Sequence, residues 1–456
     1  MEINNPHWQY YLDNMGAWVD YALELQTEYR QCDLEGRDVT KYKAALDEIS
    51  KLGSGEEKDI LADAMYKALE MTPIKDGYPY DEPSDLAGIQ AARPASRKTA
   101  VRLSGADIDA LGSRIRGAWY GRICGCLLGK PVEGWRSWNI RKYAEKQGNW
   151  PLTRYMTKDS ETAKALGQWD GGAFIDTIGG IAPSDDDTNY TVTGVKLIDR
   201  KGKRFTPDDM AFEWLRNAGI WAYCTAERVA YRNLLAGIKP PESAVYHNPY
   251  REYIGAQIRG DYFGYVNPGD PQTAADMAWR DASISHIKNG IYGEMFIAAA
   301  LAWAAVSDDI VDVIEAGLAE VPEKSRLYHE VSEIVSMYKA GKTADDASKL
   351  IHERYDESVG FDWCYTVSNA MIVAAALLWG EKDYGRTVCW AVMQGFDTDC
   401  NGATAGSILG MIIGDKAIPE EWTAPIGGRL RTAIGGYELV SIDQMADKTI
   451  AHIKAD

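Results

Sequence analysis

Four glycines recur at every fourth position of one segment: Gly117, Gly121, Gly125 and Gly129. Because a four-residue step returns to nearly the same face of an α-helix, one face of that helix carries almost no side chains. The spacing therefore predicts a helix that packs closely against a neighbour. It does not fit a phosphate-binding loop, which needs Ser or Thr after its lysine, whereas Pro131 follows Lys130 here.

The rest of the chain is also predicted to be helical. Beyond residue 105, helical runs alternate with Gly, Pro and Asp punctuation, and few segments show the period-two alternation of strands. With 46% hydrophobic residues among 456, the chain can bury a large core. We expect an all-α fold in which the aromatic loop at residues 261–271 forms a cleft wall.

The first hundred residues differ from the remainder. Apolar residues follow helical spacing through residues 4–72, for example at Trp8, Tyr11 and Leu23. Residues 72–98 then carry four prolines among Gly, Asp and Ser, a composition typical of a connector. We predict a helical amino-terminal extension over residues 1–100 and a main domain over residues 101–456.

The charge of the chain limits its partners. It has 49 Lys and Arg against 67 Asp and Glu, a formal net charge of −18. Such a chain repels a polyphosphate backbone and an anionic lipid surface, so we expect neither nucleic acid nor a membrane as a partner. Its most apolar stretches, residues 291–306 and 369–379, are shorter than the roughly 18 to 20 residues of a spanning helix.

The cysteines and the amino terminus bear on location. Seven cysteines, an odd number, favour reduced thiols, and residues 1–13 lack the pattern of a signal peptide. We therefore expect a cytoplasmic protein. Cys124 and Cys126 form a single C-x-C pair, so a structural zinc site is not expected.

Three consecutive aspartates, Asp185, Asp186 and Asp187, precede apolar residues at helical spacing, which predicts a helix amino terminus. One or two acids there have a structural explanation, because a carboxylate caps free N–H groups and suits the helix dipole. Three in a row exceed that need. Adjacent carboxylates repel one another unless a cation lies between them, and oxygen ligands favour Mg²⁺, Mn²⁺ or Ca²⁺.

A second acidic motif, GFDTDCNG, covers residues 395–402. If the chain is extended before the next helix, Asp397 and Asp399 point to the same side and can share one cation. The motif does not continue as an EF-hand, because the twelfth position holds Ile408 instead of Glu. Small residues follow, which predicts a tightly packed helix that fixes the acids; the alternative is a turn capped by Asp.

Together these segments resemble the ADP-ribosylglycohydrolase family. The matching text is GCLLGKPVE at residues 125–133, DDT at residues 186–188 and GFDTDCNGATAGSILG at residues 395–410. The resemblance covers about residues 111–436. It implies a compact all-α fold with two divalent cations, Mg²⁺ or Mn²⁺, at the bottom of a cleft.

The resemblance also implies roles for single residues. Carried over by position, Asp186, Asp187, Asp397 and Asp399 are metal ligands, and Asp399 also belongs to the catalytic residues. Glu133, which follows the break imposed by Pro131, takes the place of the family's acidic residue beside the scissile bond.

Three positions depart from the family pattern. Asp185 stands where Thr or Ser is common, and it can still act as a metal ligand. Cys126 replaces a frequent Asp, which affects the support of the ligands. Cys400 replaces a Thr that commonly binds the second cation, and a thiol is a soft ligand poorly matched to Mg²⁺.

Residues 281–294 fit the loop that contributes substrate contacts in the family. His286 can touch a phosphate or a ribose hydroxyl, although such a histidine is more often structural. Asn289, Tyr292 and Glu294 lie before an apolar helix, where they either line the cleft or cap that helix.

Other residues near the motifs favour ordinary structural roles. Trp363, Tyr365 and Trp390 flank apolar helices, which favours core packing over base stacking. Lys130 and Arg122 make the first motif locally basic, and a solvated helix face is the commoner explanation of such charges.

These features predict a metal-dependent glycohydrolase that cleaves a bond at the anomeric carbon of a ribose. The substrate is expected to be a small molecule or an ADP-ribosylated group. One alternative is a hydrolase of a small nucleoside or N-glycoside. Another is a binding or structural relative, like the lens crystallins that resemble this family, which Cys126 and Cys400 favour and the clustered aspartates disfavour.

Overall fold

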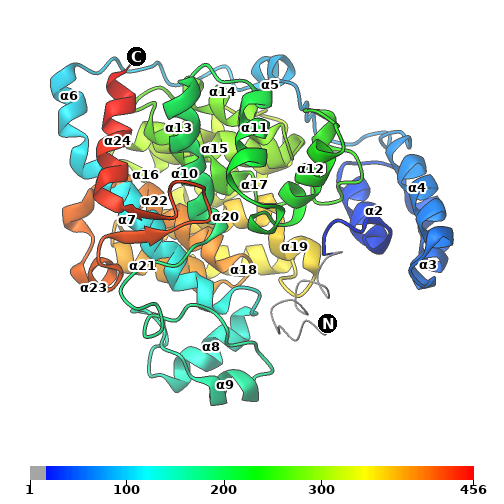
Figure 1. The fold of residues 1–456 in the computed structure, drawn as a ribbon, viewed down its shortest axis with the longest axis horizontal. Coiled ribbons are helices and arrows are strands. Elements are labelled where there is room, and N and C mark those ends of the chain that lie inside the picture. Colours follow the sequence, from blue (N-terminus) through cyan, green and yellow to red (C-terminus); the bar gives the residue numbers. More distant parts are fainter. Residues whose placement is uncertain (1–16, 456) are drawn as a thin grey trace, which may run out of the picture.

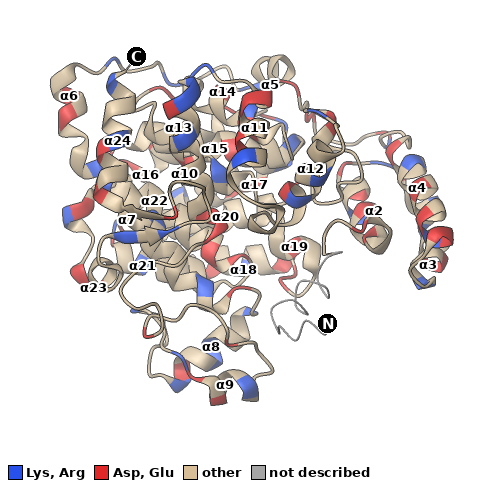
Figure 2. Cartoon of the chain, viewed as in Figure 1, with Lys and Arg blue, Asp and Glu red and all other residues tan. Residues whose placement is uncertain are grey.

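The computed structural model describes residues 17–455, and this part of the chain consists almost entirely of helices (Figure 1). The predicted all-α fold is therefore confirmed. Two short strands, β1 (Arg429–Arg431) and β2 (Leu439–Ser441), pair antiparallel, with Leu430 opposite Val440. Lys and Arg are intermixed with Asp and Glu along the helices in the view of Figure 2, rather than separated into two faces.

The extension forms a helical group at one side of the molecule (Figure 1). Its elements are η1 (Tyr21–Leu23), α2 (Leu25–Leu34), η2 (Thr40–Tyr42), α3 (Lys43–Lys51) and α4 (Glu56–Glu70). Leu25, Leu46 and Leu69 are buried in a small apolar cluster separate from the main core. Of the helical pattern predicted from residue 4, Trp8 and Tyr11 lie outside the described residues.

The connector runs along the main body. It contains α5 (Leu86–Ala92) and leads to α6 (Gly105–Ala110). Ile89 is fully buried in the main core, and the Trp279 indole donates to the Ser84 carbonyl oxygen at 2.9 Å. The connector is thus fixed along the body, although its prolines exclude regular hydrogen bonding.

The centre of the main body is a pair of helices, α7 (Gly112–Gly129) and α22 (Thr398–Ile413). They run antiparallel with their glycines in contact, so that Gly117 faces Gly410 and Gly125 faces Gly402. A β-carbon on any of these four glycines would lie under 3.0 Å from the facing backbone. The close packing predicted from the glycine spacing is confirmed, and it brings the end of α7 beside the start of α22.

The other helices surround this pair. They are η3 (Lys130–Val132), α8 (Ser137–Lys146), α9 (Ser160–Ala165), α10 (Asp186–Lys201), α11 (Pro207–Asn217), η4 (Ile220–Ala222), α12 (Thr225–Leu235), η5 (Glu242–Ala244), η6 (Gln257–Arg259), α13 (Asp261–Tyr265), α14 (Pro271–Ala282), α15 (Lys288–Ala304), α16 (Ile310–Leu318), α17 (Arg326–Lys339), α18 (Ala344–Arg354), α19 (Gly360–Cys364), α20 (Thr366–Trp379), α21 (Tyr384–Met393), η7 (Asp415–Ala417), α23 (Glu420–Thr423), η8 (Ala424–Ile426) and α24 (Ile442–Lys454). The apolar helices α15 and α20 are buried in the core. Within residues 17–455, no helix has both the length and the apolar character needed to cross a membrane.

One expectation about the cleft was wrong. Residues 261–271 were expected to form a loop at a cleft wall, but they begin with the buried helix α13. Tyr265 packs 5.8 Å from Trp119 between ring centroids, and its hydroxyl is 2.6 Å from the Ser407 hydroxyl. Tyr265 therefore packs in the core against both α7 and α22.

Candidate metal centre

The first acidic cluster lies at the amino terminus of α10, as predicted. Asp185 is the capping residue, and its Oδ1 accepts the Asp187 backbone N–H at 3.0 Å. Asp186 and Asp187 occupy the first turn. The cluster therefore serves the helix through one acid only, which leaves the other two carboxylates available for chemistry.

The second cluster lies at the amino terminus of α22. Asp397 precedes the first turn, yet its carboxylate makes no capping bond, and Asp399 belongs to the helix. The segment is not extended, so the alternation of side chains that was expected here was the wrong reason for pairing the two acids. The Asn369 side-chain oxygen accepts the Asp397 N–H at 3.2 Å and the Asn401 amide at 2.7 Å, which fixes the turn.

The structure gathers these acids into two groups of potential ligands. The ligand atoms of Asp397, Asp399 and Cys400 all lie within 4.8 Å of one another. Those of Asp185, Asp187 and Cys126 form a second group within the same limit. All of these side chains are buried, and Cys126 comes from α7.

A cation would fit the buried oxygens of this site. Oδ2 of Asp187 and Oδ1 of Asp399 are buried and accept no hydrogen bond from the described residues. An unpaired buried carboxylate oxygen is costly, and a divalent cation with oxygen ligands removes that cost. These two atoms, one from each group, are thus the strongest structural sign of a metal centre.

The acids also titrate abnormally. Burial and the neighbouring carboxylates raise the pKa values of Asp186, Asp187 and Asp397 well above their ordinary range. Burial and the Asp185 carboxylate raise the pKa of Asp399 to about 6. Asp399 in turn raises the pKa of Asp187, so the two groups share one excess of negative charge. Such an excess is typical of a site that binds cations.

Two basic residues take part in this centre, contrary to the solvated face expected for them. The Lys130 ammonium pairs with the Asp185 carboxylate; burial works to raise the pKa of Asp185, but this ammonium outweighs it and lowers the pKa. Arg122 is fully buried and donates to the Asp187 carbonyl oxygen at 2.7 Å and to Asp261 at 2.8 Å. Arg122 is the only charged residue within residues 117–129, and this was a signal for a buried ion pair.

Glu133 lies where the break at Pro131 was predicted to place it. It follows η3 directly and is exposed to solvent. Its pKa is raised well above the ordinary value, chiefly by the Asp399 carboxylate. The raised pKa favours the protonated form of Glu133, which can act as a proton donor.

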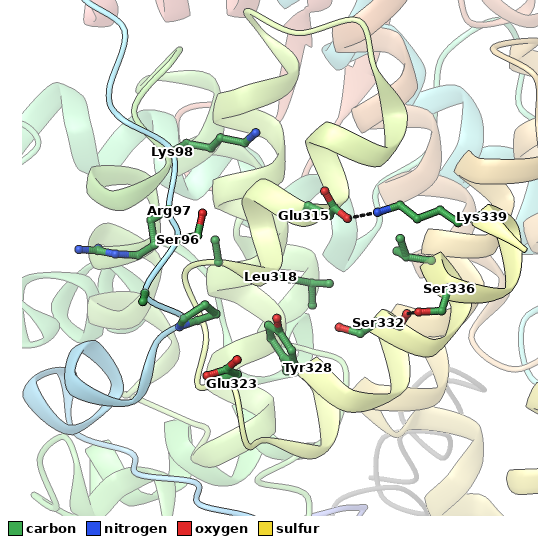
Figure 3. A pocket seen from close by; sticks show the side chains of 14 residues that line it. Ser96, Arg97, Lys98, Glu315, Leu318, Glu323, Tyr328, Ser332, Ser336 and Lys339 are labelled. Atoms are coloured by element: carbon green, nitrogen blue, oxygen red, sulfur yellow. Dashed lines mark hydrogen bonds and ion pairs between the residues drawn. The ribbon is translucent and has the colours of Figure 1, made fainter.

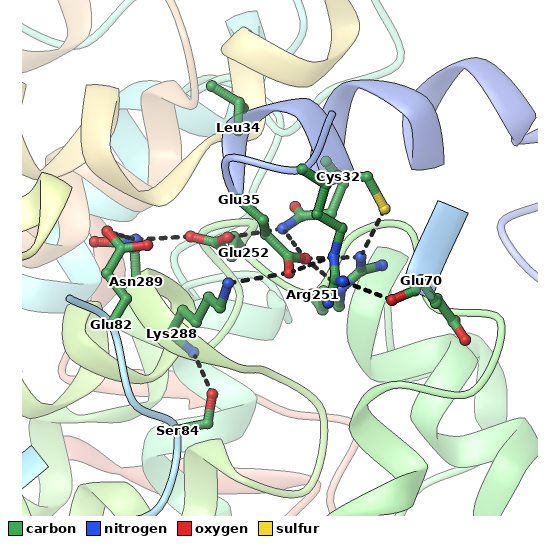
Figure 4. Close-up of polar contacts among 12 residues, drawn as sticks. Cys32, Leu34, Glu35, Glu70, Glu82, Ser84, Arg251, Glu252, Lys288 and Asn289 are labelled. Atoms are coloured by element: carbon green, nitrogen blue, oxygen red, sulfur yellow. Dashed lines mark hydrogen bonds and ion pairs between the residues drawn. The ribbon is translucent and has the colours of Figure 1, made fainter. Parts of the chain in front are cut away.

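Asn289 and Tyr292 were expected in a loop, but both are buried in α15, which begins at Lys288. The Asn289 amide donates to Glu82 and to Glu252 at 2.8 Å each (Figure 4). The Tyr292 hydroxyl donates to a backbone oxygen of the connector. Both side chains thus hold the connector in place, and a role in substrate binding stays a prediction.

His286 and Glu294 are buried as well. The His286 ring contacts the Ser285 hydroxyl at 2.8 Å, and burial lowers its pKa well below the ordinary value. Glu294 lies 3.6 Å from the Arg259 guanidinium, and burial raises its pKa. The described contacts of these residues are with the core and not with the acids of the two groups, so their assignment to substrate also stays a prediction.

The surface of the protein contains several cavities. One of about 670 Å³ lies between the connector and the helices α16 and α17 (Figure 3). Its cations are already neutralised, because Lys339 pairs with Glu315 and Lys98 pairs with Asp312. The residues that line this cavity include none of the acids of the candidate metal centre.

One protein family matches most of the chain. The ADP-ribosylglycohydrolase family model matches residues 107–453, so the chain belongs to this family. A solved structure described as an ADP-ribosylglycohydrolase-related protein complex is 18% identical, covers 76% of this chain and 99% of that chain, and gives a TM-score of 0.45. No curated protein matches the chain. The family resemblance predicted from the three motifs is confirmed, and it supports a glycohydrolase in general terms.

Proposed function

We propose that the protein is a metal-dependent glycohydrolase that cleaves the bond at the anomeric ribose carbon of an ADP-ribosyl adduct or a related ribosyl compound. The observation that carries the proposal is that two buried carboxylate oxygens, Asp187 Oδ2 and Asp399 Oδ1, have no hydrogen-bond partner among the described residues. They belong to two acidic groups whose carboxylates raise one another's pKa values. Membership of the family supplies the reaction class.

In this proposal Asp186, Asp187, Asp397 and Asp399 hold two divalent cations, Mg²⁺ or Mn²⁺. Asp185 and Cys400 complete the set of ligands, and Asp185 exchanges its Lys130 partner for metal when it does so. A bound divalent cation supplies a Lewis acid for the ribose hydroxyls and for a water molecule.

Two acids of the chain, Glu133 and Asp399, transfer the protons of the reaction. Glu133, whose pKa is raised, gives its proton to the leaving group. Asp399, with a pKa of about 6, is ionised at neutral pH and accepts a proton from water. Two carboxyl groups whose surroundings hold their pKa values apart are a recognised arrangement for acid–base catalysis of glycoside cleavage.

The compartment and the other partners belong to the same proposal. All seven cysteines are free thiols, which supports a reducing, cytoplasmic setting. A formal charge of −18 supports a small-molecule or ADP-ribosylated substrate over nucleic acid or an anionic membrane.

The test is a substrate panel with matched variants. The protein is incubated with ADP-ribosyl-arginine, ADP-ribosyl-serine and nucleosides, with Mn²⁺, Mg²⁺ or EDTA, and released ADP-ribose or ribose is measured. We expect metal-dependent release that Glu133→Gln and Asp397→Asn reduce at least a hundredfold, with Glu48→Gln as an exposed control.

Each outcome of the panel separates the candidates. Release from nucleosides alone favours the small N-glycoside hydrolase. No release from any substrate, together with no metal binding, favours the structural relative. Full activity of Glu133→Gln and Asp397→Asn contradicts the assigned roles.

A further inference from the structure

A second cavity, of about 570 Å³, lies between the extension and the main body. Trp18, Glu24, Tyr29 and Arg30 line its extension side. The opposite side belongs to α12, α19 and the segment that precedes η6. The extension therefore contributes one wall of an open cavity.

Cys364 lies between this cavity and the candidate metal centre. The Cys364 side chain lines the cavity, and its thiol donates to Oδ2 of Asp397 at 3.5 Å. Thr225 also lines the cavity, next to Cys224, whose pKa is raised by burial and then by Asp186 and Glu133. A molecule in the cavity would thus lie one side chain away from the candidate metal ligands.

Aromatic side chains make up a large part of the lining, and one of them carries an indole N–H without a partner among the described residues. Trp18 and Tyr29 come from the extension, and Tyr253, Phe361 and Trp363 come from the body. The Trp363 side chain is half-buried, and its buried Nε1 has no hydrogen-bond partner among the described residues. Trp363 packs against the core, as expected, and its position also suits a planar ligand that stacks on rings and accepts one hydrogen bond.

The extension wall is held in place by buried ion pairs. The Arg251 guanidinium lies 2.6 Å from Glu28 on α2. It also lies 2.7 Å from Glu35, which follows α2 (Figure 4). The Arg228 guanidinium lies 4.4 Å from the centre of the Trp18 ring. A wall fixed in this way can orient a bound group, which a loosely attached appendage cannot.

We infer that the amino-terminal extension completes the substrate site and that its wall binds a planar aromatic part of the substrate, such as a nucleobase. The inference rests on the proposed function, because it gives this cavity the part of the substrate that extends from the ribose at the acids. The extension then selects substrates by the group that they carry and leaves the bond cleavage to the main domain.

The test compares two ligands that differ in the planar group. Binding of ADP-ribose, which carries adenine, and of ribose 5-phosphate, which does not, is measured by calorimetry on the full chain with Mn²⁺. We expect Tyr29→Ala and Trp363→Phe to weaken ADP-ribose binding about tenfold each. Ribose 5-phosphate binding is expected to stay within twofold of the unaltered protein.

Leu23→Ala is the matched control, because Leu23 belongs to the same extension, is 55% exposed and does not line the cavity. Circular dichroism checks the folding of each variant. If Tyr29→Ala does not fold, Trp363→Phe alone decides, since it keeps an aromatic side chain and removes the pyrrole ring with its N–H donor.

Unchanged ADP-ribose binding in both folded variants overturns the inference and leaves the proposed function standing. Equal weakening of both ligands also overturns it, since the wall would then act only on the ribose end. An unaltered protein that binds Mn²⁺ but neither ligand contradicts the proposed function and the inference together.

Discussion

Gly125 on α7 and Gly402 on α22 face each other so closely that a β-carbon on either would overlap the other's carbonyl oxygen. This contact is the reason that the end of α7, with Lys130 and Glu133, lies beside the acids that open α22. The metal centre therefore depends on helix packing that takes place away from its ligands.

Gly125→Ala tests that dependence. We expect it to lower the free energy of unfolding by about 3 kcal/mol, because the facing backbone cannot move away from an added methyl group. Chemical denaturation measures the loss, and Mn²⁺ binding should weaken in parallel. Gly105→Ala is the control, since nothing lies within 4 Å of a β-carbon there. Equal stability of the two variants would contradict the packing argument.

Lys130→Met tests the role of the Lys130 ammonium in the candidate metal centre. The variant leaves the buried Asp185 carboxylate unpaired, so the metal-free protein should lose about 3 kcal/mol of stability. Mn²⁺ binding should instead tighten severalfold, because one positive charge has left the site. Lys339→Met, which breaks an exposed pair with Glu315, should cost under about 1 kcal/mol (Figure 3). Weaker Mn²⁺ binding in Lys130→Met would argue against a competition between lysine and metal.

The raised pKa values predict how the stability of the metal-free protein depends on pH. The folded chain binds the Asp399 proton more tightly than the unfolded chain, with a pKa of about 6 against about 3.9. This contribution to stability is therefore complete below about pH 4 and is lost as the pH rises through 6. Thermal unfolding should show a shallower pH dependence between pH 4 and 7 in Asp399→Asn. Identical pH profiles would show that Asp399 titrates normally.

Arg251→Met tests how the extension is attached. Removing the guanidinium leaves Glu28 buried without a cation and leaves Glu35 with its pairs to Lys288 and Arg37, and a loss of about 3 kcal/mol is expected. Amide hydrogen exchange should then rise first in α2. Exchange that rises evenly over the whole chain would mean that the extension and the body unfold as one unit.

Local sequence signals predicted much of the fold. The glycine spacing identified α7 and its smooth face, and the three aspartates identified the start of α10. Each depends only on neighbouring residues and on helix periodicity. Such signals could not identify the helix that packs against α7. Gly125 and Gly402 are far apart in the chain, and neither segment specifies the other as its partner.

The candidate site was predictable in its acids and less so in its surroundings. Asp397 and Asp399 were paired for the wrong local reason, since their segment is a helix start and not a strand. Asn289 was expected in a loop, but it lies in α15 and its amide donates to Glu82 of the connector, a contact across 207 positions. Burial and contacts between residues far apart in the chain determine the positions of such side chains. The local sequence composition does not reveal these contacts.

Calorimetric titration of the metal-free protein with Mn²⁺ tests the central claim most directly. The claim is that the acids at the starts of α10 and α22 form one centre for divalent cations. It predicts saturable binding of two Mn²⁺ per chain, lost or weakened at least a hundredfold in the double variant Asp187→Asn, Asp399→Asn and retained in the exposed control Asp308→Asn. Absence of binding to the unaltered protein, or equal binding to the double variant, would contradict it.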